Sequence, residues 1–528
     1  MKNVSSRLSL IAIALLAYGW RLHDLTRQSL WRDEVDAIYF ALRPLHETLA
    51  MFTAVAQNGA LYFISLRPWL QVAGSSEFAL RYISVMGGVI STLLLWRVAR
   101  VLLRPSNEQN GWSANTAALI AALLFACNPY QLWYSQEGKM YTLTTALALL
   151  SSWFWLMGIW RRNVRHNWRN WLGYFGVTSL AMYTHLLMVL LIPLHFLWFW
   201  IAWPQSKRRW RGYFGALAGL TLPYVPFAWW HWAMLTSGRH MTGFNFTPLE
   251  QMVQTLLLNH TRGFMPPGKL IWLSPIFFLG LAGLLMGMTE LGGSQRATLY
   301  RGLPLWRLSN WRRFLLIITW FLMPILFIYA ISLRQPIFVD RYIIWIAPAA
   351  IMLLVLGLMV VWRNALFLSK PLTALLLLYV VGFWLYAGWE QKNTEIKYDI
   401  RSAVTYIATR RAPDELLILQ IPHMEYSYRY YSGDKGSAPF ADSDARLGHW
   451  AGGLWTNNGS SDEQARLDVD SQMRTLVAGS SSLWVLSSEV QMWDRRQLMD
   501  EWLNAHGVLT DKADFHGAQV RHYELTRL

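Results

Sequence analysis

The sequence of 528 residues contains a single cysteine, Cys127, and few charged residues, which make up 15% of the chain. One cysteine excludes an intrachain disulfide and any metal site built from several cysteines. Cys127 ends an apolar run and is expected to be a small core residue. Because 54% of the residues are hydrophobic, the composition is too apolar for an ordinary soluble protein and predicts a polytopic membrane protein.

Two further absences narrow the function. The chain has no internal repeat and no glycine-rich phosphate loop of the form GxxxxGK[ST], so coupling to nucleotide hydrolysis within this chain is not expected. The net charge of +16 raises the question of nucleic-acid binding. The lysines and arginines, however, lie in short clusters between apolar stretches, which is the pattern of cytoplasmic loops in membrane proteins.

Apolar stretches recur along the first three quarters of the chain. A bilayer core about 30 Å thick needs about 20 apolar residues in a helix. We therefore expect about eleven transmembrane helices within a transmembrane domain of residues 1–389. They are expected near residues 6–23, 79–103, 114–128, 140–160, 170–185, 186–203, 213–232, 269–288, 314–332, 342–362 and 371–389.

The first apolar run, Leu8 to Trp20, follows Lys2 and Arg7 and resembles a secretory signal. A cleaved signal is the alternative to a first transmembrane helix. Retention is favoured because no clear small-x-small cleavage site precedes the polar loop and because further spans follow at once.

Basic clusters predict the orientation of the spans. They fall on alternate connections, which are therefore expected to be cytoplasmic together with the N-terminus. The clusters are Arg97–Arg104, Arg161–Arg169, Lys207–Arg211, Arg296–Arg313 and Arg363–Lys370. The opposite connections are 24–78, 129–139, 233–268, 333–341 and the tail, all expected outside the cell membrane.

After Trp389 the sequence loses its membrane character. The tail has an expected helix from Asp399, strands Leu416–Gln420 and Leu483–Ser487, a loop-like interval Ser432–Ser471, and a helix Arg495–Ala505 ending at Gly507. We therefore expect residues 390–528 to be a soluble extracytoplasmic domain. The fold class predicted is an α-helical polytopic membrane protein with a C-terminal α/β domain.

The first outer loop carries an acidic cluster directly after the first span. Asp33, Glu34 and Asp36 lie beside Arg32 and several aromatic residues, just outside the expected bilayer. Partial desolvation raises the pKa of a carboxylate while a neighbouring arginine keeps it ionised, so such a group can act as a base at the membrane surface. The alternative is that these acids only cap an interfacial helix.

The same loop holds two further candidates. Gln57 to Phe63 offers Asn58 and Tyr62 for sugar hydroxyls, although turn formation at Asn58-Gly59 is an equally adequate explanation. Arg81 follows Glu77 by four residues at the start of the second span, where a structural ion pair is the alternative to a binding role.

Later outer connections supply more ionisable groups. Glu137, Lys139 and Tyr141 lie at the entrance of an apolar helix, where charged groups usually face a cavity or a partner. His185 stands at the apex of a short turn and is either a hydrogen-bonding cap or a substrate contact. Arg341 follows Asp340 above the tenth span and is suited to bind phosphate bidentately.

Together these stretches resemble the GT-C class of membrane glycosyltransferases, in particular the family of dolichyl-phosphate-mannose protein mannosyltransferases and aminoarabinose transferases. The stretches that carry the resemblance are Trp31–Glu34, Gln57–Tyr62, Ser76–Arg81, Tyr134–Tyr141, Tyr183–His185 and Asp340–Tyr342. They cover most of the membrane part, in family order and on the expected side.

The resemblance implies a single sugar carried on a polyprenyl phosphate, with Asp33 as the base. It also implies that Glu137 shapes the donor or acceptor site and that Lys139 and Arg341 hold the phosphate. The chain departs from the family at Gly138-Lys139, where many relatives carry Ala-Arg, and at Tyr82-Ile83, where Leu-Pro is frequent. Gln57 to Ala60 replaces the commoner His-Pro-Pro, which puts a metal-ligand role of that loop in doubt.

The expected function is inverting transfer of one sugar to an acceptor hydroxyl of a glycan, lipid or protein. Asp33 and Glu34 are the expected catalytic residues, with Asp33 as the base and Glu34 or Glu137 orienting the acceptor. No metal ligand set is predicted, and a divalent ion is optional because the donor carries one charged phosphate. The alternatives are a non-catalytic protein that binds lipid-linked sugars, and a transporter, which would place charges within the spans. Nucleic acid is not an expected partner.

Overall fold

The structure is a computed structural model of the chain. It describes residues 2–526 except 53–57, 106–111, 161–166, 222–223, 226–227, 230–231, 233–235, 237–243, 269, 292–309, 365–367, 422–423, 434–445, 450–460 and 491–493. Gln57 and much of the interval 432–471 therefore lie outside the described residues.

The chain divides into two compact units, each built from several segments. The helical unit comprises Met1–Asp24, Pro44–Ser65 and Arg81–Thr394, and the sheet unit comprises Leu25–Arg43, Leu66–Leu80 and Glu395–Leu528. Two segments of the first outer loop thus pack with the C-terminal segment. The expected domain ranges 1–389 and 390–528 stay a prediction about folding.

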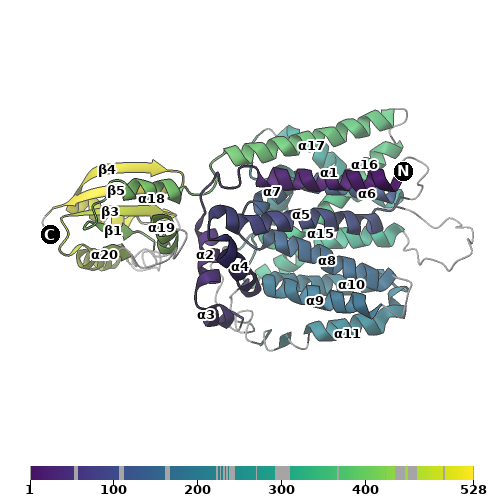
Figure 1. The fold of residues 1–528 in the computed structure, drawn as a ribbon, viewed down its shortest axis with the longest axis horizontal. Coiled ribbons are helices and arrows are strands. Elements are labelled where there is room, and N and C mark those ends of the chain that lie inside the picture. Colours follow the sequence, from purple (N-terminus) through teal and green to yellow (C-terminus); the bar gives the residue numbers. More distant parts are fainter. Residues whose placement is uncertain are drawn as a thin grey trace, which may run out of the picture. The chain divides into compact units, whose positions relative to one another are not determined.

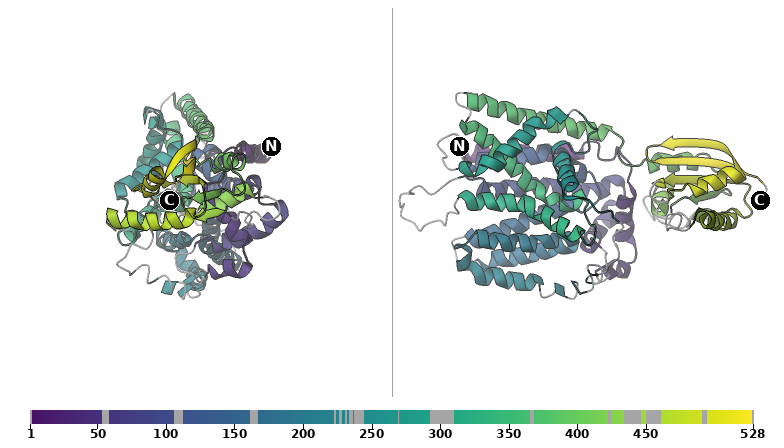
Figure 2. Two further views of the ribbon diagram at one scale, coloured as in Figure 1. Left: turned by 90° about the vertical axis from the view of Figure 1, so that its left-hand side faces the viewer. Right: turned by 180° about the vertical axis from the view of Figure 1, so that it is seen from behind.

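Helices form the helical unit, and the longer ones lie side by side in Figures 1 and 2. They are α1 (Lys2–Leu22), α5 (Glu77–Leu102), α6 (Ala114–Cys127), α7 (Pro129–Ser135), α8 (Tyr141–Trp160), α9 (Trp168–Thr184), α10 (Leu191–Ile201), α11 (Trp210–Thr221), α13 (Leu249–Arg262), α14 (Ser274–Glu290), α15 (Asn310–Ser332), α16 (Ala347–Asn364) and α17 (Ser369–Asn393). Short 3₁₀ helices precede α10 (η2, Leu186–Leu190), α11 (η3, Ser206–Arg209), α14 (η5, Leu270–Leu273) and α16 (η6, Asp340–Ile346).

Six of the described helices are long and apolar enough to cross a membrane: α5, α8, α14, α15, α16 and α17, with η5 and η6 extending α14 and α16. The pair α6 and α7 adds a seventh if a helix bent by 59° counts as one span. The bend falls at Asn128-Pro129, where proline removes a backbone donor. The chain is therefore a multi-pass membrane protein, and the count of about eleven spans stays a prediction.

Two glycines bring α14 and α16 into backbone contact. A methyl group on Gly283 would overlap the Leu353 carbonyl oxygen, and one on Gly357 would overlap the Leu279 carbonyl oxygen. Small residues allow such close approach, which matters in lipid because no hydrophobic force drives apolar helices together there. Close packing at the two glycines therefore holds α14 against α16, and we call this contact the α14–α16 seam.

Arg21 fixes the end of α1 against α6 and α7. Its side chain is fully buried and donates to Ser135 Oγ at 3.0 Å and to the carbonyl oxygens of Phe125 and Ala126 at 3.3 and 3.0 Å. A buried guanidinium is costly unless its donors are satisfied, and these acceptors are the carbonyls that the bend leaves free. The contacts position α7, which carries part of the candidate site.

The sheet unit is built around one five-stranded mixed sheet in the order β2-β1-β3-β5-β4. Its strands are β1 (Leu416–Leu419), β2 (Leu447–His449), β3 (Ser482–Ser488), β4 (Gly507–Phe515) and β5 (Ala518–Leu525). Strand β1 pairs parallel with β2 and β3, whereas β5 pairs antiparallel with β3 and β4. The β4–β5 hairpin turns through Gly517, whose φ of +67° favours glycine.

Helices cover both faces of this sheet (Figure 1). Leu416, Ile418 and Val485 pack against α20 (Asp462–Val477) and α22 (Leu498–His506). Leu417, Leu419 and Leu486 pack against α18 (Ile400–Ala408) and α19 (Glu425–Ser432). Strands buried on both faces read as continuous apolar runs, which explains the sequence of β1 and β3.

Several expectations for the tail are confirmed. Asp399 caps α18 by accepting from the Ser402 amide at 3.1 Å, and β1, β3 and α22 lie where the sequence predicted them. The loop-like interval is wrong at residues 447–449, which form β2, and from residue 462 onward, where α20 begins with Ser461 as its N-cap. The apolar spacing of Ala465, Val469 and Met473 on one face of α20 was the missed signal.

Candidate active site

The acidic cluster of the first outer loop forms the start of α2 (Arg32–Leu42) in the sheet unit. Asp33 lies in the first turn and is half-buried, whereas Glu34 is fully buried. The N-terminus of a helix favours negative charge because its amides point outward unpaired. The two neighbouring acids therefore lie at the same helix end but differ in their exposure to solvent.

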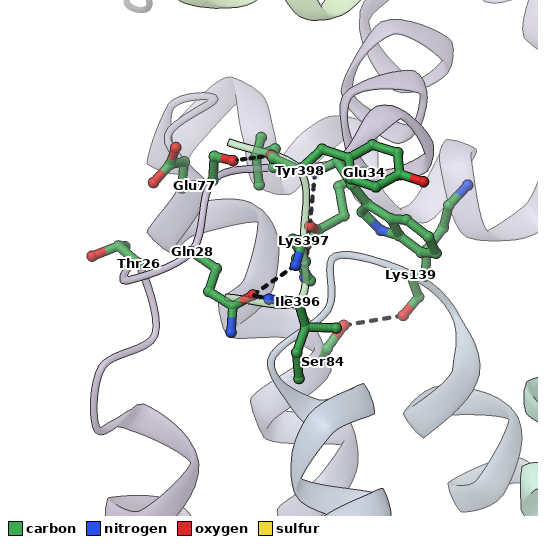
Figure 3. Close-up of polar contacts among 12 residues, drawn as sticks. Thr26, Gln28, Glu34, Glu77, Ser84, Lys139, Ile396, Lys397 and Tyr398 are labelled. Atoms are coloured by element: carbon green, nitrogen blue, oxygen red, sulfur yellow. Dashed lines mark hydrogen bonds and ion pairs between the residues drawn. The ribbon is translucent and has the colours of Figure 1, made fainter. Parts of the chain in front are cut away.

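Glu34 is held by a lysine from the far end of the sequence. Lys397 Nζ lies 2.7 Å from Glu34 Oε2, and its side chain is 5% exposed (Figure 3). The Trp31 amide also donates to Glu34 Oε2 at 3.4 Å, so Glu34 serves in addition as a helix cap. The cap interpretation considered from the sequence thus describes Glu34, while it leaves the role of Asp33 open.

Hydrogen bonds to backbone amides reinforce the Glu34–Lys397 ion pair, and together these contacts form a first clamp. Gln28 Oε1 accepts from the amides of Ile396 at 3.2 Å and Lys397 at 2.9 Å, as Figure 3 shows. Nearby, Arg32 pairs with Glu489 at 3.1 Å. The segment before α2 is therefore fixed to the segment that follows α17.

A second clamp acts at the start of α5. Glu77 accepts from Arg401 Nη2 at 2.9 Å and from the Tyr431 hydroxyl at 2.7 Å. Burial, followed by the Glu77 carboxylate, raises the pKa of Tyr431 well above its ordinary value, so its hydroxyl stays a donor. The Tyr39 ring on α2 stacks on Tyr426 at 3.9 Å between centroids. Helices α18 and α19 thus hold the start of α5, and α19 also packs against the acidic helix α2.

In the helical unit, Arg341 and Tyr141 meet although 200 residues separate them. Arg341 Nε donates to the Tyr141 hydroxyl at 2.9 Å. The His185 ring lies 4.9 Å from the Tyr342 ring and 6.4 Å from the Tyr141 ring. Its Nδ1 accepts from the Leu187 amide, so His185 caps η2, and its buried Nε2 has no hydrogen-bond partner among the described residues.

Asp340 organises the other side of this cluster. It accepts from the Tyr130 hydroxyl at 2.9 Å and from Asn259 Nδ2 at 2.8 Å. The Tyr130 ring contacts His260, with 4.7 Å between centroids, and the Tyr134 ring at 4.9 Å. Asp340 is thereby anchored to α7 and α13, which leaves the adjacent Arg341 in a fixed position.

Lys139 lies on the turn between α7 and α8. Its carbonyl accepts from Ser84 Oγ at 3.0 Å (Figure 3), and its ammonium lies 5.8 Å from the centroid of Phe63. Glu137, two residues earlier, is buried. The turn thus presents a half-buried cation on a fixed backbone.

The remaining predicted site residues of the helical unit are Asn58, Tyr62 and Arg81, and each is packed within that unit. Asn58 Oδ1 accepts from the Leu186 amide at 2.9 Å, which ties the first outer loop to η2. Tyr62 is buried on α4 (Ala60–Ala73) beside Phe63, with 5.6 Å between ring centroids. Arg81 is buried in α5.

The structure therefore gathers Tyr141, His185 and Arg341 in the helical unit and places Asp33 and Glu34 in the sheet unit. The sequence did not single out Tyr130, Asn259 or His260, which line the same cluster as Asp340. A polar Asn-His-Thr-Arg ending of an amphipathic helix in an outer loop was the available signal. Within the described residues, no three His, Cys, Asp or Glu side chains are grouped as a metal site.

Comparisons with known proteins bear on the family and the fold. Residues 58–232 match the family described as dolichyl-phosphate-mannose-protein mannosyltransferase. No curated protein matches the chain in a sequence comparison.

Solved structures extend the similarity over nearly the whole chain. ArnT from Cupriavidus metallidurans in the apo state matches with a TM-score of 0.55 and 14% identity, covering 99% of this chain and 98% of that one. ArnT bound to undecaprenyl phosphate matches with a TM-score of 0.53 and 13% identity over 97% of both chains.

The Archaeoglobus fulgidus oligosaccharyltransferase in the apo form matches with a TM-score of 0.56 and 13% identity, covering 99% of this chain and 74% of that one. At such identity these matches show the fold. The chain is thus a multi-pass membrane protein with the fold of ArnT, and its residues 58–232 match the family described as dolichyl-phosphate-mannose-protein mannosyltransferase.

Proposed function

We propose that the chain transfers a single sugar, with inversion, from a polyprenyl-phosphate donor to an acceptor hydroxyl on the extracytoplasmic side of the membrane. The observation that carries the proposal is the environment of α2: Asp33 stays half-buried and reachable while its neighbour Glu34 is locked by Lys397. A general base must be held in place and still reach its substrate.

The chemistry explains why a base is needed. The acceptor hydroxyl has a pKa far above neutrality, so Asp33 would take its proton as the oxygen attacks the anomeric carbon. The bond from that carbon to the phosphate breaks on the opposite face, and the polyprenyl phosphate leaves with a second negative charge. One displacement inverts the configuration, and one base suffices. Glu34 would keep Asp33 in position.

Cations must meet the charge that develops on the leaving phosphate. Arg341 suits this role because its guanidinium can bind two phosphate oxygens and is oriented by Tyr141. Lys139 would add a second positive charge, and Arg81 a third. Glu137, His185, Asn58 and Tyr62 would line the donor or acceptor site. The lipid phosphate named in the ArnT complex supports a donor of this kind.

The test is Asp33→Asn in the purified full chain, supplied with a panel of polyprenyl-phosphate sugars and acceptors. We expect transfer to fall by about 10²–10⁴-fold, the usual contribution of a general base. Donor affinity, measured by titration of the same lipid, should stay close to that of the native chain. Asp36→Asn is the matched control, because Asp36 is half-buried one turn later on the same helix.

Three outcomes would overturn the proposal. Equal transfer by the native chain and Asp33→Asn would remove Asp33 from the chemistry. Donor binding without transfer to any acceptor in the native chain would instead support a non-catalytic binding protein, and donor movement across vesicles would support a transporter.

A further inference from the structure

The helical unit contains a basic cavity that the proposed reaction does not use. It has a volume of about 730 Å³ and lies among the last turns of α5, the first turn of α6 and the later part of α8. Arg97, Arg100 and Arg104 line it together with Trp96 and Trp153. Among the described residues that line it there are three arginines and no acidic side chain, so this lining carries positive charge.

The cavity is at the opposite end of α8 from Tyr141. Asn115, at the start of α6, lines it and donates to Ser6 Oγ near the beginning of α1 at 3.0 Å. The basic clusters of the sequence place this end of the helices on the cytoplasmic side. A ligand of the cavity and a donor at Arg341 would therefore approach the chain from opposite faces of the membrane.

The cavity is preorganised for an anion. The Arg100 guanidinium lies 4.8 Å from the Trp96 ring centroid and the Arg97 guanidinium 5.9 Å from that of Trp153. Trp96 is itself fixed, because its indole donates to Asn115 Oδ1 at 3.2 Å. Stacking on a ring orients a guanidinium while leaving its N–H donors free to bind.

Two of the three arginines, Arg97 and Arg100, have no carboxylate partner within the described ranges. Neither Arg97 nor Arg100 forms an ion pair with any residue in the described part of the chain, and both are exposed. Two stacked cations around one cavity repel each other in the absence of an anion. A bound phosphate group would relieve this repulsion.

We propose that this cavity binds the headgroup of an anionic phospholipid of the cytoplasmic leaflet, with the phosphodiester between Arg97 and Arg100. Tryptophan and arginine together are typical of the membrane interface, and basic pockets between helix ends on this side bind anionic headgroups. The volume lies in the range of small-molecule sites, which fits a headgroup with its glycerol better than a single inorganic ion. This proposal is independent of the glycosyltransferase assignment.

The test is native mass spectrometry of the full chain in neutral detergent, titrated with phosphatidylglycerol and, separately, with zwitterionic phosphatidylcholine. We expect one phosphatidylglycerol to bind with a preference over phosphatidylcholine. The double variant Arg97→Gln/Arg100→Gln should bind it about 30-fold more weakly, which corresponds to about 1 kcal/mol for each arginine.

The matched control is Arg169→Gln/Arg211→Gln. These two arginines also lie over tryptophan rings, at 5.7 and 5.6 Å, at the starts of α9 and α11, but they do not line the cavity. The control should keep the native affinity. Equal weakening in both double variants would show a general attraction to basic loops and would overturn the proposal.

Competition separates the lipid from a free anion. Inorganic phosphate and soluble glycerophosphoglycerol, added at the concentration of the lipid, should leave the bound phosphatidylglycerol in place. Displacement by inorganic phosphate at equal concentration would mean a simple anion site and would overturn the lipid assignment. If the double variant does not fold, as judged by its melting temperature in phosphatidylcholine, Arg100→Gln alone should weaken binding about 5-fold.

Discussion

Asp33 and Glu34 are adjacent in the sequence, yet burial gives them different physical roles. A fully buried carboxylate is stable only when a cation or several donors satisfy it, and Lys397 does so for Glu34. Asp33, one residue earlier, lies about 100° around the helix from Glu34 and is half-buried. The surroundings of each side chain, and not its position in the sequence, thus distinguish the two carboxylates.

The Glu34–Lys397 pair gives a prediction about stability. Lys397→Met leaves an uncompensated buried carboxylate and should destabilise the chain by about 3–5 kcal/mol. The double variant Glu34→Leu/Lys397→Met removes both charges and should regain most of that loss, because an apolar pair of similar size is often neutral. Chemical unfolding of the purified chain measures both. Equal stability of native chain and Lys397→Met would show that the pair contributes nothing.

Much of the candidate site could be proposed from residue types alone. Glu137 and Lys139 stood out because charged groups at the ends of apolar helices are costly, and Arg341 stood out because a guanidinium binds phosphate bidentately. The hydrogen bond between Arg341 and Tyr141 was beyond the sequence, because it joins two turns that meet only after several helices pack. Asn259 was missed for the same reason, since its partner Asp340 lies 81 residues away.

At the scale of elements, the α14–α16 seam allows a sharp comparison between glycines. Gly283→Ala should push the helices apart and destabilise the chain by about 1–3 kcal/mol, the usual cost of overpacking, because its methyl meets a backbone carbonyl that cannot move alone. Gly280→Ala is the control, since its methyl would lie 3.7 Å from Leu354 Cδ2, an ordinary contact. Thermal unfolding in one detergent compares them. Similar melting temperatures for both variants would contradict the tight seam.

We expect the stability of strand β1 to depend on pH through Glu415, the residue directly before the strand. Burial alone raises the pKa of Glu415, but hydrogen bonds from the Trp484 indole, the Ala412 amide, the Ser482 hydroxyl and the His522 ring lower it below the ordinary value. The stabilisation is therefore fully present above about pH 4.3 and is lost as the pH falls from there through the lower folded pKa.

Glu415→Gln should remove this acid dependence. Hydrogen exchange of β1 and β3 peptides in the full chain, corrected for intrinsic rates between pH 3 and 6, measures it. The native chain should lose protection toward pH 3, whereas Glu415→Gln should show a flatter profile. Glu463→Gln, an exposed acid on α20, is the control and should follow the native profile. Parallel profiles for the native chain and Glu415→Gln would refute the prediction.

Local signals predicted the tail elements unevenly. The apolar runs of β1 and β3 were sufficient because both strands are buried along their length, and the Asp399 cap marked the start of α18, which is buried on one face. Strand β4 alternates between exposed and half-buried residues, so it carries no apolar run. Its pairing with β5 depends on the turn at Gly517 and on neighbours that the local pattern does not contain.

For the whole molecule, the distribution of arginine and lysine predicts orientation, and the single cysteine makes this testable. In a Cys127→Ala background, Glu395→Cys should react with a membrane-impermeant maleimide on intact cells. Lys207→Cys should react only after the membrane is permeabilised. Both positions are exposed in the structure, so access depends on the membrane side. The reverse labelling pattern would invert the predicted topology.

The fold is shared with ArnT across 99% of the chain at 14% identity. Such conservation of shape with little conservation of sequence is expected when apolar helices exchange one lipid-compatible side chain for another. Fewer side chains can replace a residue that packs against backbone atoms or that carries a buried charge.

The seam between Gly283 and Gly357 also bears on how the chain is made. Helix α15 lies between α14 and α16 in the sequence, so the ribosome completes and releases α14 well before its partner exists. The glycine face of α14 must therefore wait in the bilayer, solvated by lipid tails, until α16 has been inserted. A nascent chain arrested before Ala347 would leave that face open.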